Sequence, residues 1–404
     1  MFAKVRKLGD VVDIIGGGTP SKANEGFYEG DILWATVRDM KQEHLTDTEL
    51  KITHEAIMNS STNIIKAGNI IIATRVGLGK VCKLQKDTAI NQDLKALIPK
   101  NSDLDRDYLF WWLKSVANLI VEAGTGATVQ GVKIPFIKAL DIPLPSTAEQ
   151  KRIVAILDYV FADIEKVRAN AETNLKKARE LLNSYLQKVF SQRGEGWREE
   201  RVENLTYLVT KGSSPKWQGI CYVDEPGILF VTSENVGRNE MTFKNEKYVE
   251  ELFNQKASKS ILQKGDVLTN IVGASIGRTA IYDRDNLANI NQAVCLLRCK
   301  PDLLNNEYLA YLLNSPYFIN FLHENEVNNA RANLSLSFFR ELAIPVPKLN
   351  VQHNIVKEIK AMLSKVMHLE MIYLDKLNAI DELKQSLLQK AFTGELTKSK
   401  GIAA

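Results

Sequence analysis

Glycine, hydroxyl and basic side chains gather in two short loops of the 404-residue sequence. The segment GGGTPSK, residues 16–22, combines backbone N–H groups with two hydroxyls and a lysine, and KGSSPK, residues 211–216, repeats the combination with two lysines. A loop of this kind can bind the phosphate oxygens of a nucleic acid. The predicted phosphate-binding residues are Thr19, Ser21, Lys22, Lys211, Ser213, Ser214 and Lys216.

A second polar, glycine-containing loop follows a β-rich run in each half of the sequence. Its candidates are Thr74, Arg75 and Lys80 in the first half and Asn270, Ser275 and Arg278 in the second. Arginine and lysine can pair with guanine O6 and N7, and asparagine or glutamine with adenine N6 and N7. Further candidates for contacts to bases are Arg38, Gln92, Gln130, Gln292 and Arg331. Each of these signals is weak alone, since glycines make turns and most surface lysines are only solvated, but their duplication favours a protein that reads two half-sites on DNA.

The motifs of common enzyme classes are absent from the sequence. There is no G-x-x-x-x-G-K-[ST] phosphate loop and no G-x-G-x-x-G that follows a strand. The five histidines show no metal-ligand spacing with one another or with cysteine: His44, His54, His323, His353 and His368. We therefore predict no catalytic residue, no metal and no cofactor for this chain.

Two motifs come close to a functional pattern. NSPYF, residues 314–318, is similar to the N-P-P-Y/F motif with which adenine methyltransferases hold a flipped base, but a serine replaces the first proline. The segment also continues an apolar helical pattern, so a helix end in the core is the favoured interpretation. Cys295 and Cys299 lie on one face of a predicted strand, where a buried apolar pair is favoured over half of a metal site.

Composition places the chain among folded proteins. Hydrophobic residues make up 45% and charged residues 25%, and the formal net charge is +4. At roughly 150 residues per domain, the length predicts two or three domains. Four cysteines are too few for a disulfide framework and indicate a reducing compartment. Without an apolar signal core, or an apolar run near the ~20 residues that a membrane helix needs, we expect a cytoplasmic protein that does not bind membranes.

The sequence contains one unit of about 200 residues written twice. Asn91-Gln92 recurs as Asn291-Gln292, which is 200 residues later, and FIKALDIPLP, residues 136–145, recurs as FFRELAIPVP, residues 338–347. Each unit begins with β-rich runs such as DILWATV (31–37) and GILFVTS (227–233), and continues with a helix near Tyr108 or Tyr308. This pattern predicts a compact α/β or α+β domain in each half.

A long helix follows each pair of prolines. Ser146 and Glu149 form a capping box and Gly194 a stop for the first helix; Asn350 is a weaker cap and Gly394 a stop for the second. Apolar residues alternate at steps of four and three, which is the period of a coiled coil. Because two such helices occur in one chain with a domain between them, we expect an antiparallel intramolecular coiled coil with pseudo-twofold symmetry. Its seam is predicted to contain Ile153, Leu157, Val160, Ile164, Val167, Asn174, Leu181, Ile355, Ile359, Met362, Val366, Leu369, Lys376 and Leu383.

Asn174 and Lys376 hold the same position in the two copies of this stripe. A polar seam residue can fix the register of a coiled coil at a cost in stability. Alternatively, Lys376 extends its amino group out of the seam into solvent. A further set of apolar residues is expected to face outward: Ile156, Phe161, Leu182, Leu186 and Leu388.

These features resemble the DNA-sequence specificity subunit of type I restriction–modification systems. The resemblance covers the whole chain and rests on the tandem plan and three motifs. They are IPLP followed by EQKRIV (142–154) with its partner IPVP and VQHNIV, the KGDVL strand entry at Lys264, and the ending LLQKAFTGEL (387–396). It implies target recognition domains at 1–145 and 197–347, a central helix at 146–196 and a C-terminal helix at 348–404.

In this interpretation the chain is a non-catalytic reader of double-stranded DNA. Each domain would enter a major groove at one half of a bipartite site, and the helices would set the gap between the halves. The outward apolar face would bind two methyltransferase subunits, and separate restriction and translocase subunits would cut the DNA. Two alternatives remain from the sequence: a free-standing repressor-like DNA-binding protein, and a fused adenine methyltransferase with a degenerate motif at Asn314.

Overall fold

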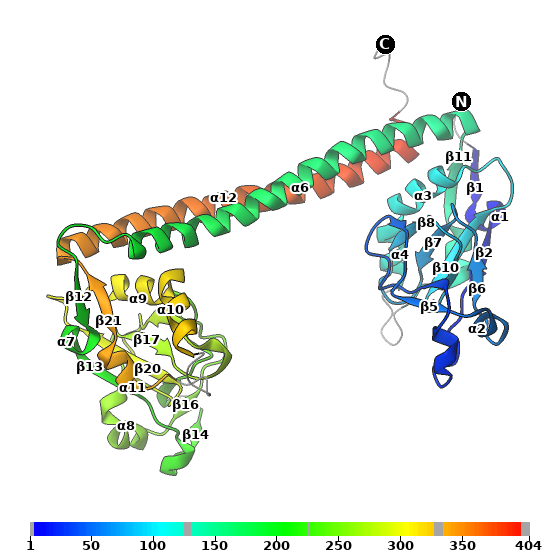
Figure 1. Cartoon of the computed structure of the whole chain (residues 1–404). Coiled ribbons are helices and arrows are strands. Elements are labelled where there is room, and N and C mark those ends of the chain that lie inside the picture. Colours follow the sequence, from blue (N-terminus) through cyan, green and yellow to red (C-terminus); the bar gives the residue numbers. More distant parts are fainter. Residues whose placement is uncertain (1–3, 125–130, 225, 327–333, 397–404) are drawn as a thin grey trace. The chain divides into compact units, whose positions relative to one another are not determined.

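The computed structural model describes residues 4–124, 131–224, 226–326 and 334–396. The chain divides into two compact units, one formed by the residues up to 171 together with those from 375 onward, and the other by residues 172–374. Each unit contains a mixed domain of strands and short helices and parts of two long helices, α6 (Thr147–Ser191) and α12 (Leu349–Phe392) (Figure 1). The predicted class, two α+β domains with long helices, is confirmed.

Two sheets build the domain of the first unit. One has the strand order β2-β10-β7-β8-β4 and the other β5-β3-β9-β6. The strands are β2 (Val12–Gly16), β3 (Ile32–Ala35), β4 (His44–Leu45), β5 (Leu50–Ile52), β6 (Asn63–Ile65), β7 (Ile70–Ala73), β8 (Val81–Leu84), β9 (Thr88–Ile90) and β10 (Leu94–Pro99). A separate antiparallel pair, β1 (Lys4–Lys7) and β11 (Asp141–Leu144), lies before the start of α6.

Short helices cover these sheets. They are α1 (Leu8–Val11), the 3-10 helix η1 (Glu25–Tyr28), α2 (His54–Met58), α3 (Arg106–Ser115), α4 (Ala117–Gly124) and α5 (Ile134–Ala139). Strand β7 is buried at every position, as its uninterrupted apolar run predicts. Helix α3 buries Tyr108 and Trp112 in a core that also contains Ile153 and Leu157 of α6 and Leu388 of α12. The beginning of α6 and the end of α12 therefore belong to this domain.

The second unit repeats this plan. Its sheets have the orders β13-β20-β17-β18 and β14-β16-β15-β19, and β12 pairs with β21. The strands are β12 (Arg198–Arg201), β13 (Thr206–Lys211), β14 (Tyr222–Val223), β15 (Ile228–Val231), β16 (Tyr248–Val249), β17 (Val267–Asn270), β18 (Thr279–Ile281), β19 (Ala288–Ile290), β20 (Val294–Cys299) and β21 (Ala343–Val346). The helices are α7 (Val202–Leu205), η2 (Lys216–Gln218), α8 (Leu252–Lys256), η3 (Ser258–Ser260), η4 (Gly273–Ser275), α9 (Asn306–Asn314), α10 (Pro316–Glu326) and α11 (Leu336–Glu341).

The repeat predicted from the sequence is present in the hydrogen-bond pattern. Strands β3 and β9 form a parallel pair in the first unit, and β15 and β19 form the corresponding pair in the second. Tyr108 donates its hydroxyl to the carbonyl of Pro143 at 2.8 Å, and Tyr308 donates to Pro345 at 2.7 Å. The prolines that precede the long helices thus accept the same bond in both units.

The predicted limits of the long helices are confirmed at the start of α6 and at the end of α12, whereas α6 ends three residues before the stop predicted at Gly194. Ser146 accepts a hydrogen bond from the backbone N–H of Glu149 before α6, which ends at Ser191, and Gly394 follows α12 with a φ of +77°. The cap predicted at Asn350 is wrong. Helix α12 begins at Leu349, and the carbonyl of Lys348 accepts from Val351 and Gln352, so Asn350 lies inside the first turn.

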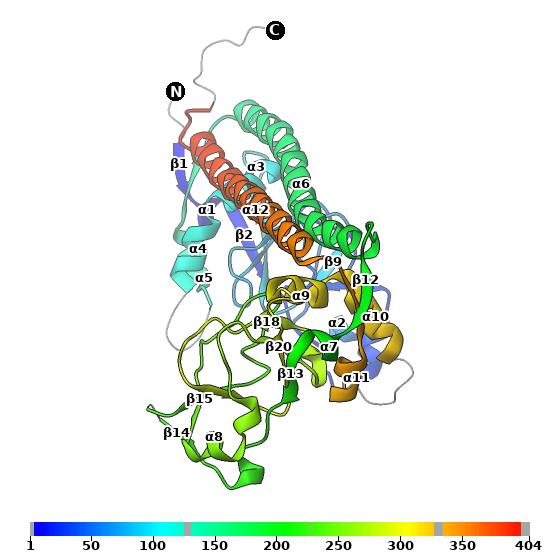
Figure 2. The same cartoon turned by 90° about the vertical axis from the view of Figure 1, so that its left-hand side faces the viewer.

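Antiparallel pairing of α6 and α12 is visible within each unit (Figures 1 and 2). In the first unit Glu165 pairs with Lys384, and Arg168, one turn later, pairs with Asp381. In the second unit Arg179 bonds to Glu370 at 2.9 Å. Tyr185, further along α6, bonds to the earlier residue Glu358 at 2.9 Å. Partner numbers fall as residue numbers rise, which is the antiparallel arrangement that the sequence predicts.

The seam follows the predicted stripe only in part. Most of its predicted members are buried or half-buried: Ile153, Leu157, Val160, Ile164, Asn174, Ile355, Ile359, Met362, Val366 and Leu369. Val167, Leu181, Lys376 and Leu383 are exposed, so their assignment to the seam is wrong. An α-helix drifts about 20° per heptad from a strict 3.5-residue repeat, and Leu175 is buried instead. The exposure of Lys376 fits the alternative in which its amino group reaches solvent.

Three residues of the predicted outward face are also placed differently. Phe161, Leu186 and Leu388 are buried, whereas Ile156 and Leu182 are half-buried. Phe161 packs against the Trp111 ring with centroids 4.5 Å apart, and Leu186 lies in the core of the second unit. The ends of the long helices need a broad apolar face because a domain covers them there. No helix in the described parts of the chain combines the length and apolar character needed to span a bilayer.

Candidate nucleic-acid interface

The glycine-rich loop of the first domain is held tightly against the parallel strand pair. A Cβ on Gly17 would lie 2.1 Å from the carbonyl oxygen of Ile90, so only glycine fits there. Gly18 donates its N–H to Ile90 at 3.0 Å, and its carbonyl accepts from Trp34 at 3.2 Å and from Thr62 at 2.8 Å. The N–H of Gly18 is therefore not available to a phosphate. These bonds fix the direction in which the next residues leave the loop.

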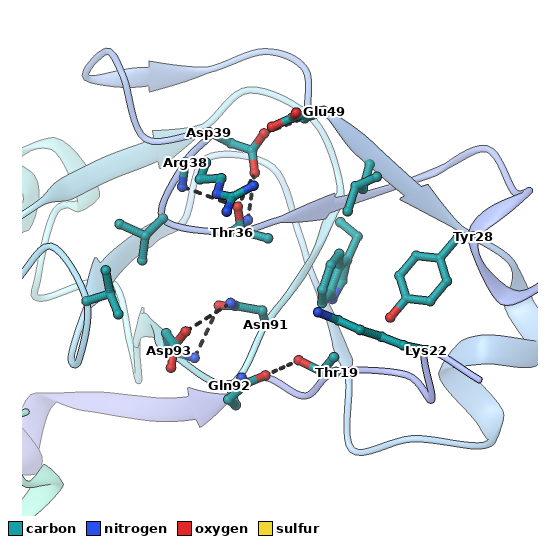
Figure 3. Close-up of a pocket in the computed structure, with 14 residues that line it drawn as sticks. Thr19, Lys22, Tyr28, Thr36, Arg38, Asp39, Glu49, Asn91, Gln92 and Asp93 are labelled. Atoms are coloured by element: carbon teal, nitrogen blue, oxygen red, sulfur yellow. Dashed lines mark hydrogen bonds between the residues drawn. The ribbon is translucent and has the colours of Figure 1, made fainter. Parts of the chain in front are cut away.

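A cavity of about 560 Å³ opens beside this loop. We call it the first-domain pocket. Four predicted contact residues, from three separate parts of the sequence, line it: Thr19, Lys22, Arg38 and Gln92. Thr19 donates its hydroxyl to the side-chain oxygen of Gln92, and Figure 3 shows Lys22 extending into the pocket from the loop. Lys22, Arg38 and Gln92 are exposed, so they are accessible to a large ligand.

Three carboxylates in the wall offset the two cations of this pocket. Asp39 accepts from the backbone and hydroxyl of Thr36, at 2.8 and 2.9 Å, and from the backbone N–H of Glu49 at 2.8 Å. Asp93 lies 3.7 Å from the guanidinium of Arg75. Both carboxylates are thus engaged within the protein, while Glu49 is exposed.

Sequence reasoning missed several residues of the pocket wall. Tyr28 and Trp34 form an edge-to-face aromatic pair with ring centroids 5.8 Å apart. Asn91 accepts from the backbone N–H of Asp93 at 3.1 Å, and Asn291 accepts from that of Ala293 at the same distance. The Asn-Gln pair that recurs in the two halves of the sequence was the feature that could have indicated this turn. The asparagine builds the turn in both domains, and the glutamine that follows it is exposed in the first domain and half-buried in the second.

Lys95 stabilises the turn that contains Asn91 and Gln92. Its amino group donates to the carbonyl of Gln92 at 2.7 Å and to that of Leu94 at 3.1 Å. Burial lowers the pKa of Lys95, and the nearby charge of Asp93 opposes that change. The half-buried Lys95 therefore helps to position the backbone of Gln92.

The second polar loop of the first domain places fewer side chains on the surface of the first-domain pocket than the sequence predicts. Thr74 is buried, and its backbone N–H and hydroxyl donate to the carbonyl of Asp93 at 2.8 and 3.0 Å. The prediction that Thr74 contacts DNA is wrong, because its polar atoms stabilise the turn beneath the pocket. Arg75 is exposed and does not line the pocket, but it is paired with Asp93, which does. Lys80 is exposed too but lines a different cavity of about 350 Å³. Ser21 is exposed beside Lys22.

The corresponding loop of the second domain is anchored in the same way. A Cβ on Gly212 would lie 1.8 Å from the carbonyl oxygen of Ile290, which matches the position of Gly17 against Ile90. Lys211 and Lys216 are exposed, and Ser213 and Ser214 are half-buried. Ser213 accepts from the side chain of Gln218 at 2.7 Å. Both domains therefore present a fixed loop with hydroxyl and lysine side chains.

Asn270 is a second prediction that the structure contradicts. The side chain is fully buried and donates to the carbonyls of Ser233 and Val236, at 2.9 and 3.3 Å, and to the hydroxyl of Ser275 at 3.1 Å. It therefore ties two loops together and does not reach solvent, and the hydroxyl of the half-buried Ser275 takes part in this network. Arg278 is exposed and Gln292 is half-buried.

Two predicted contact residues, Gln130 and Arg331, lie outside the described residues.

The NSPYF motif, which is similar to the motif of adenine methyltransferases, has a structural role at Asn314. Its side chain is buried, accepts from the backbone of Thr279 at 3.2 Å, and donates to Asn239, Thr279 and Ala310 at 2.7–3.0 Å. With every polar atom bonded inside the core, Asn314 cannot hold a flipped adenine, and this removes the argument for a fused methyltransferase.

The cysteine pair is also structural. Cys295 is buried, Cys299 is partly buried, and burial raises the pKa of each thiol to about 12. Among the residues that the structure describes, no group of three or more histidine, cysteine or carboxylate side chains is arranged to hold a metal ion.

Comparison with known proteins identifies the repeated domain. The family model of the type I restriction modification DNA specificity domain matches residues 3–174 and again residues 195–376. The chain is 24% identical over 330 residues to the type I restriction enzyme MjaIX specificity subunit of Methanocaldococcus jannaschii, covering 73% of this chain and 75% of that one.

Two solved structures share the fold. One is a chain from a type I restriction–modification system studied for its complex assembly and conformational transition, with a TM-score of 0.76, 20% identity and 98% of both chains covered. The other is the HsdS subunit of Thermoanaerobacter tengcongensis, with a TM-score of 0.59, 20% identity and 97% of both chains covered. The two matches to the family model span most of the sequence, and the chain belongs to the family of type I restriction–modification DNA specificity proteins.

Proposed function

We propose that this chain reads a bipartite site on double-stranded DNA for a type I restriction–modification complex, with one domain for each half-site. The observation that carries this proposal is the first-domain pocket. It brings Thr19, Lys22, Arg38 and Gln92 together on one surface although up to 73 residues separate them in the sequence. Family membership supports DNA as the ligand, and it favours a specificity subunit over a free-standing repressor.

The chemistry of the pocket suits a groove of DNA. Lys22 and Arg38 can bind phosphate oxygens or guanine, and the amide of Gln92 can bind the adenine edge. Exposed Glu49 can accept a hydrogen bond from the amino group of cytosine. Because Asp39 and Asp93 are already engaged by internal partners, they contribute less repulsion toward phosphates than free carboxylates would.

Substitutions in the pocket test this assignment. In the assembled complex with modification subunits, we expect Gln92→Ala to weaken binding to the unaltered site by roughly 5- to 150-fold, the cost of about 1–3 kcal/mol for one lost base contact. Lys22→Ala should weaken binding to all sequences and reduce the salt dependence by about one phosphate contact. Lys51→Ala, at an exposed lysine that does not line the pocket, is the matched control.

We further propose that methyl transfer and cleavage reside in partner subunits and that this chain is non-catalytic. Three exposed apolar residues of α12, Met367, Met371 and Leu374, are spaced four and three apart and so share one face of the helix. They replace the outward face predicted from the sequence as our candidate surface for a modification subunit. A cytoplasmic location belongs to the same proposal, because the chain would act on genomic DNA.

If Met367, Met371 and Leu374 form the docking surface, charged residues at these positions should prevent binding of the modification subunit. Met367→Glu with Met371→Glu should abolish copurification of the modification subunit while the chain keeps its helical content in circular dichroism. Glutamate at Ala361 and Lys365, two exposed positions of α12 that are neither three nor four residues from these methionines, is the control pair. Retention of the modification subunit by the methionine variant would contradict this surface.

A further inference from the structure

Trp217 is the most prominent apolar side chain on the anchored loop of the second domain. It lies in η2 and is 78% exposed. Burial of an indole ring removes a large apolar area from water and stabilises a protein, so tryptophan is usually buried in a core or in an interface. A tryptophan that stays exposed therefore often marks a binding surface. The proposed function assigns no role to this residue, so its exposure needs an explanation.

The loop holds Trp217 in a fixed position. Pro215 accepts hydrogen bonds from the backbone of Gln218 at 2.9 Å and of Ile220 at 3.0 Å. Lys256 donates to the carbonyl of Gln218 at 2.7 Å. Ile220 then enters a core cluster with Phe230 and Phe253. Since the residues on both sides are tied down, the indole is presented to solvent by a rigid turn.

The repeat relates Trp217 to a residue of the first-domain pocket. Gly17 and Gly212 are pressed against corresponding carbonyls, and Pro215 follows Gly212 at the same interval as Pro20 follows Gly17. Counted from these anchors, Trp217 stands where the first domain has Lys22, which lines the pocket. The second domain thus places an aromatic ring where the first domain places a cation.

The charge around Trp217 favours a nucleic acid over an apolar protein partner. Residues 211–222 contain two lysines and no acidic residue, and Lys211 and Lys216 are both exposed. Tyr222, 58% exposed, adds a second aromatic ring to the same segment. Exposed lysines can bind the phosphates of a duplex while a neighbouring aromatic ring stacks on a base at a step that is opened. In both views, β14 and α8 lie at the end of the second domain away from its portions of α6 and α12 (Figures 1 and 2).

We infer that Trp217 inserts its indole against a base step of the second half-site and is a specificity-determining residue of that domain. This rests on the proposed function, because it takes the second domain as a DNA reader. An aromatic wedge partly unstacks the step that it enters, and pyrimidine–purine steps deform at the least cost. The second half-site should therefore contain such a step where the indole enters.

Binding by the full chain assembled with its modification subunits tests the inference. The probe is a duplex that carries the site mapped by methylation, titrated at several salt concentrations. We expect Trp217→Ala to weaken binding about tenfold or more with no change in the salt slope, because the indole carries no charge. Trp217→Phe should restore most of the affinity. Lys216→Ala should instead lower the slope by about one. Tyr207→Ala, at an aromatic residue of the same domain that is 66% exposed, is the matched control.

Photocrosslinking gives a readout that does not depend on any variant. Thymines of the second half-site are replaced by 5-iodouracil, and the unaltered complex should crosslink through the peptide that contains Trp217. An affinity for Trp217→Ala within twofold of the unaltered complex, or the absence of this crosslink, overturns the inference. Loss of the modification subunit with unchanged DNA affinity also overturns it and assigns Trp217 to protein docking. If the unaltered complex bound no DNA, the proposed function would fail first.

Discussion

Gln150 and Gln352 occupy the same structural position in the two units. Each is fully buried near the start of a long helix. Gln150 accepts from the backbone of Asp105 at 2.8 Å and donates to the carbonyls of Asp103 and Pro145 at 2.7 and 2.9 Å. Gln352 makes the corresponding three bonds to Asn305, Leu303 and Pro347 at 2.8–3.0 Å. One amide in each unit therefore joins the helix to its domain.

This relationship predicts a local loss of stability. Gln150→Ala and Gln352→Ala each leave a backbone N–H and two carbonyls without their partner, and we expect a cost of about 2–3 kcal/mol. Hydrogen exchange should show the loss within the unit that carries the substitution. Gln385→Ala, at an exposed glutamine of α12, is the control. Equal effects for all three variants would show that the amide bonds contribute nothing to stability.

The buried asparagine of the second domain gives a second prediction. Asn270→Ala removes three hydrogen bonds between loops and should lower the free energy of unfolding by about 1–3 kcal/mol. The fraction that remains folded should bind DNA as before, because the side chain does not reach solvent. Thermal unfolding and a DNA titration on the same samples separate the two effects. A loss of affinity without a loss of stability would restore Asn270 as a contact residue.

Cysteine reactivity supplies a third prediction. Cys221 is exposed, whereas burial raises the pKa of Cys82 to about 11 and that of Cys295 and Cys299 to about 12. The reactive thiolate forms only as pH rises toward these values, so at pH 8 roughly one in a thousand Cys82 thiols is ionised. Iodoacetamide should therefore modify Cys221 first, as measured by mass spectrometry, and all four cysteines should react in denaturant. Rapid modification of Cys295 in the native protein would contradict its burial.

The helices supply a fourth prediction, which tests whether they set the distance between half-sites. Seven residues are inserted after Ala171 in α6 and after Leu374 in α12, which adds roughly 10 Å to each helix. The gap in the recognised site should lengthen by about 3 bp, given about 34 Å per turn of DNA. Methylation mapping measures this gap. A gap of unchanged length would rule out the helices as the measure of spacing.

The fold was largely predictable because the sequence repeats one unit, and each copy of this unit forms one domain and one long helix. Segments that recur at offsets near 200 residues predicted two domains, and the apolar stripe predicted paired helices, which are both observed. Burial of individual polar residues was not predictable. Thr74 and Asn270 have the same composition around them as a contact loop, but they lie at the ends of β7 and β17, where their side chains donate to carbonyls of neighbouring turns. Phe161 and Leu388 fell on the apparent outer face because the sequence does not show where a domain covers a helix.

The central claim is that each domain reads its own half of a bipartite site. Sequencing the methylated positions in cells that carry this chain with its modification subunits tests it most directly, first for the unaltered chain and then for Gln92→Ala. We predict two short half-sites separated by a fixed gap, with the substitution relaxing one half and leaving the other intact. A single uninterrupted motif, or a substitution that alters both halves together, would contradict the account.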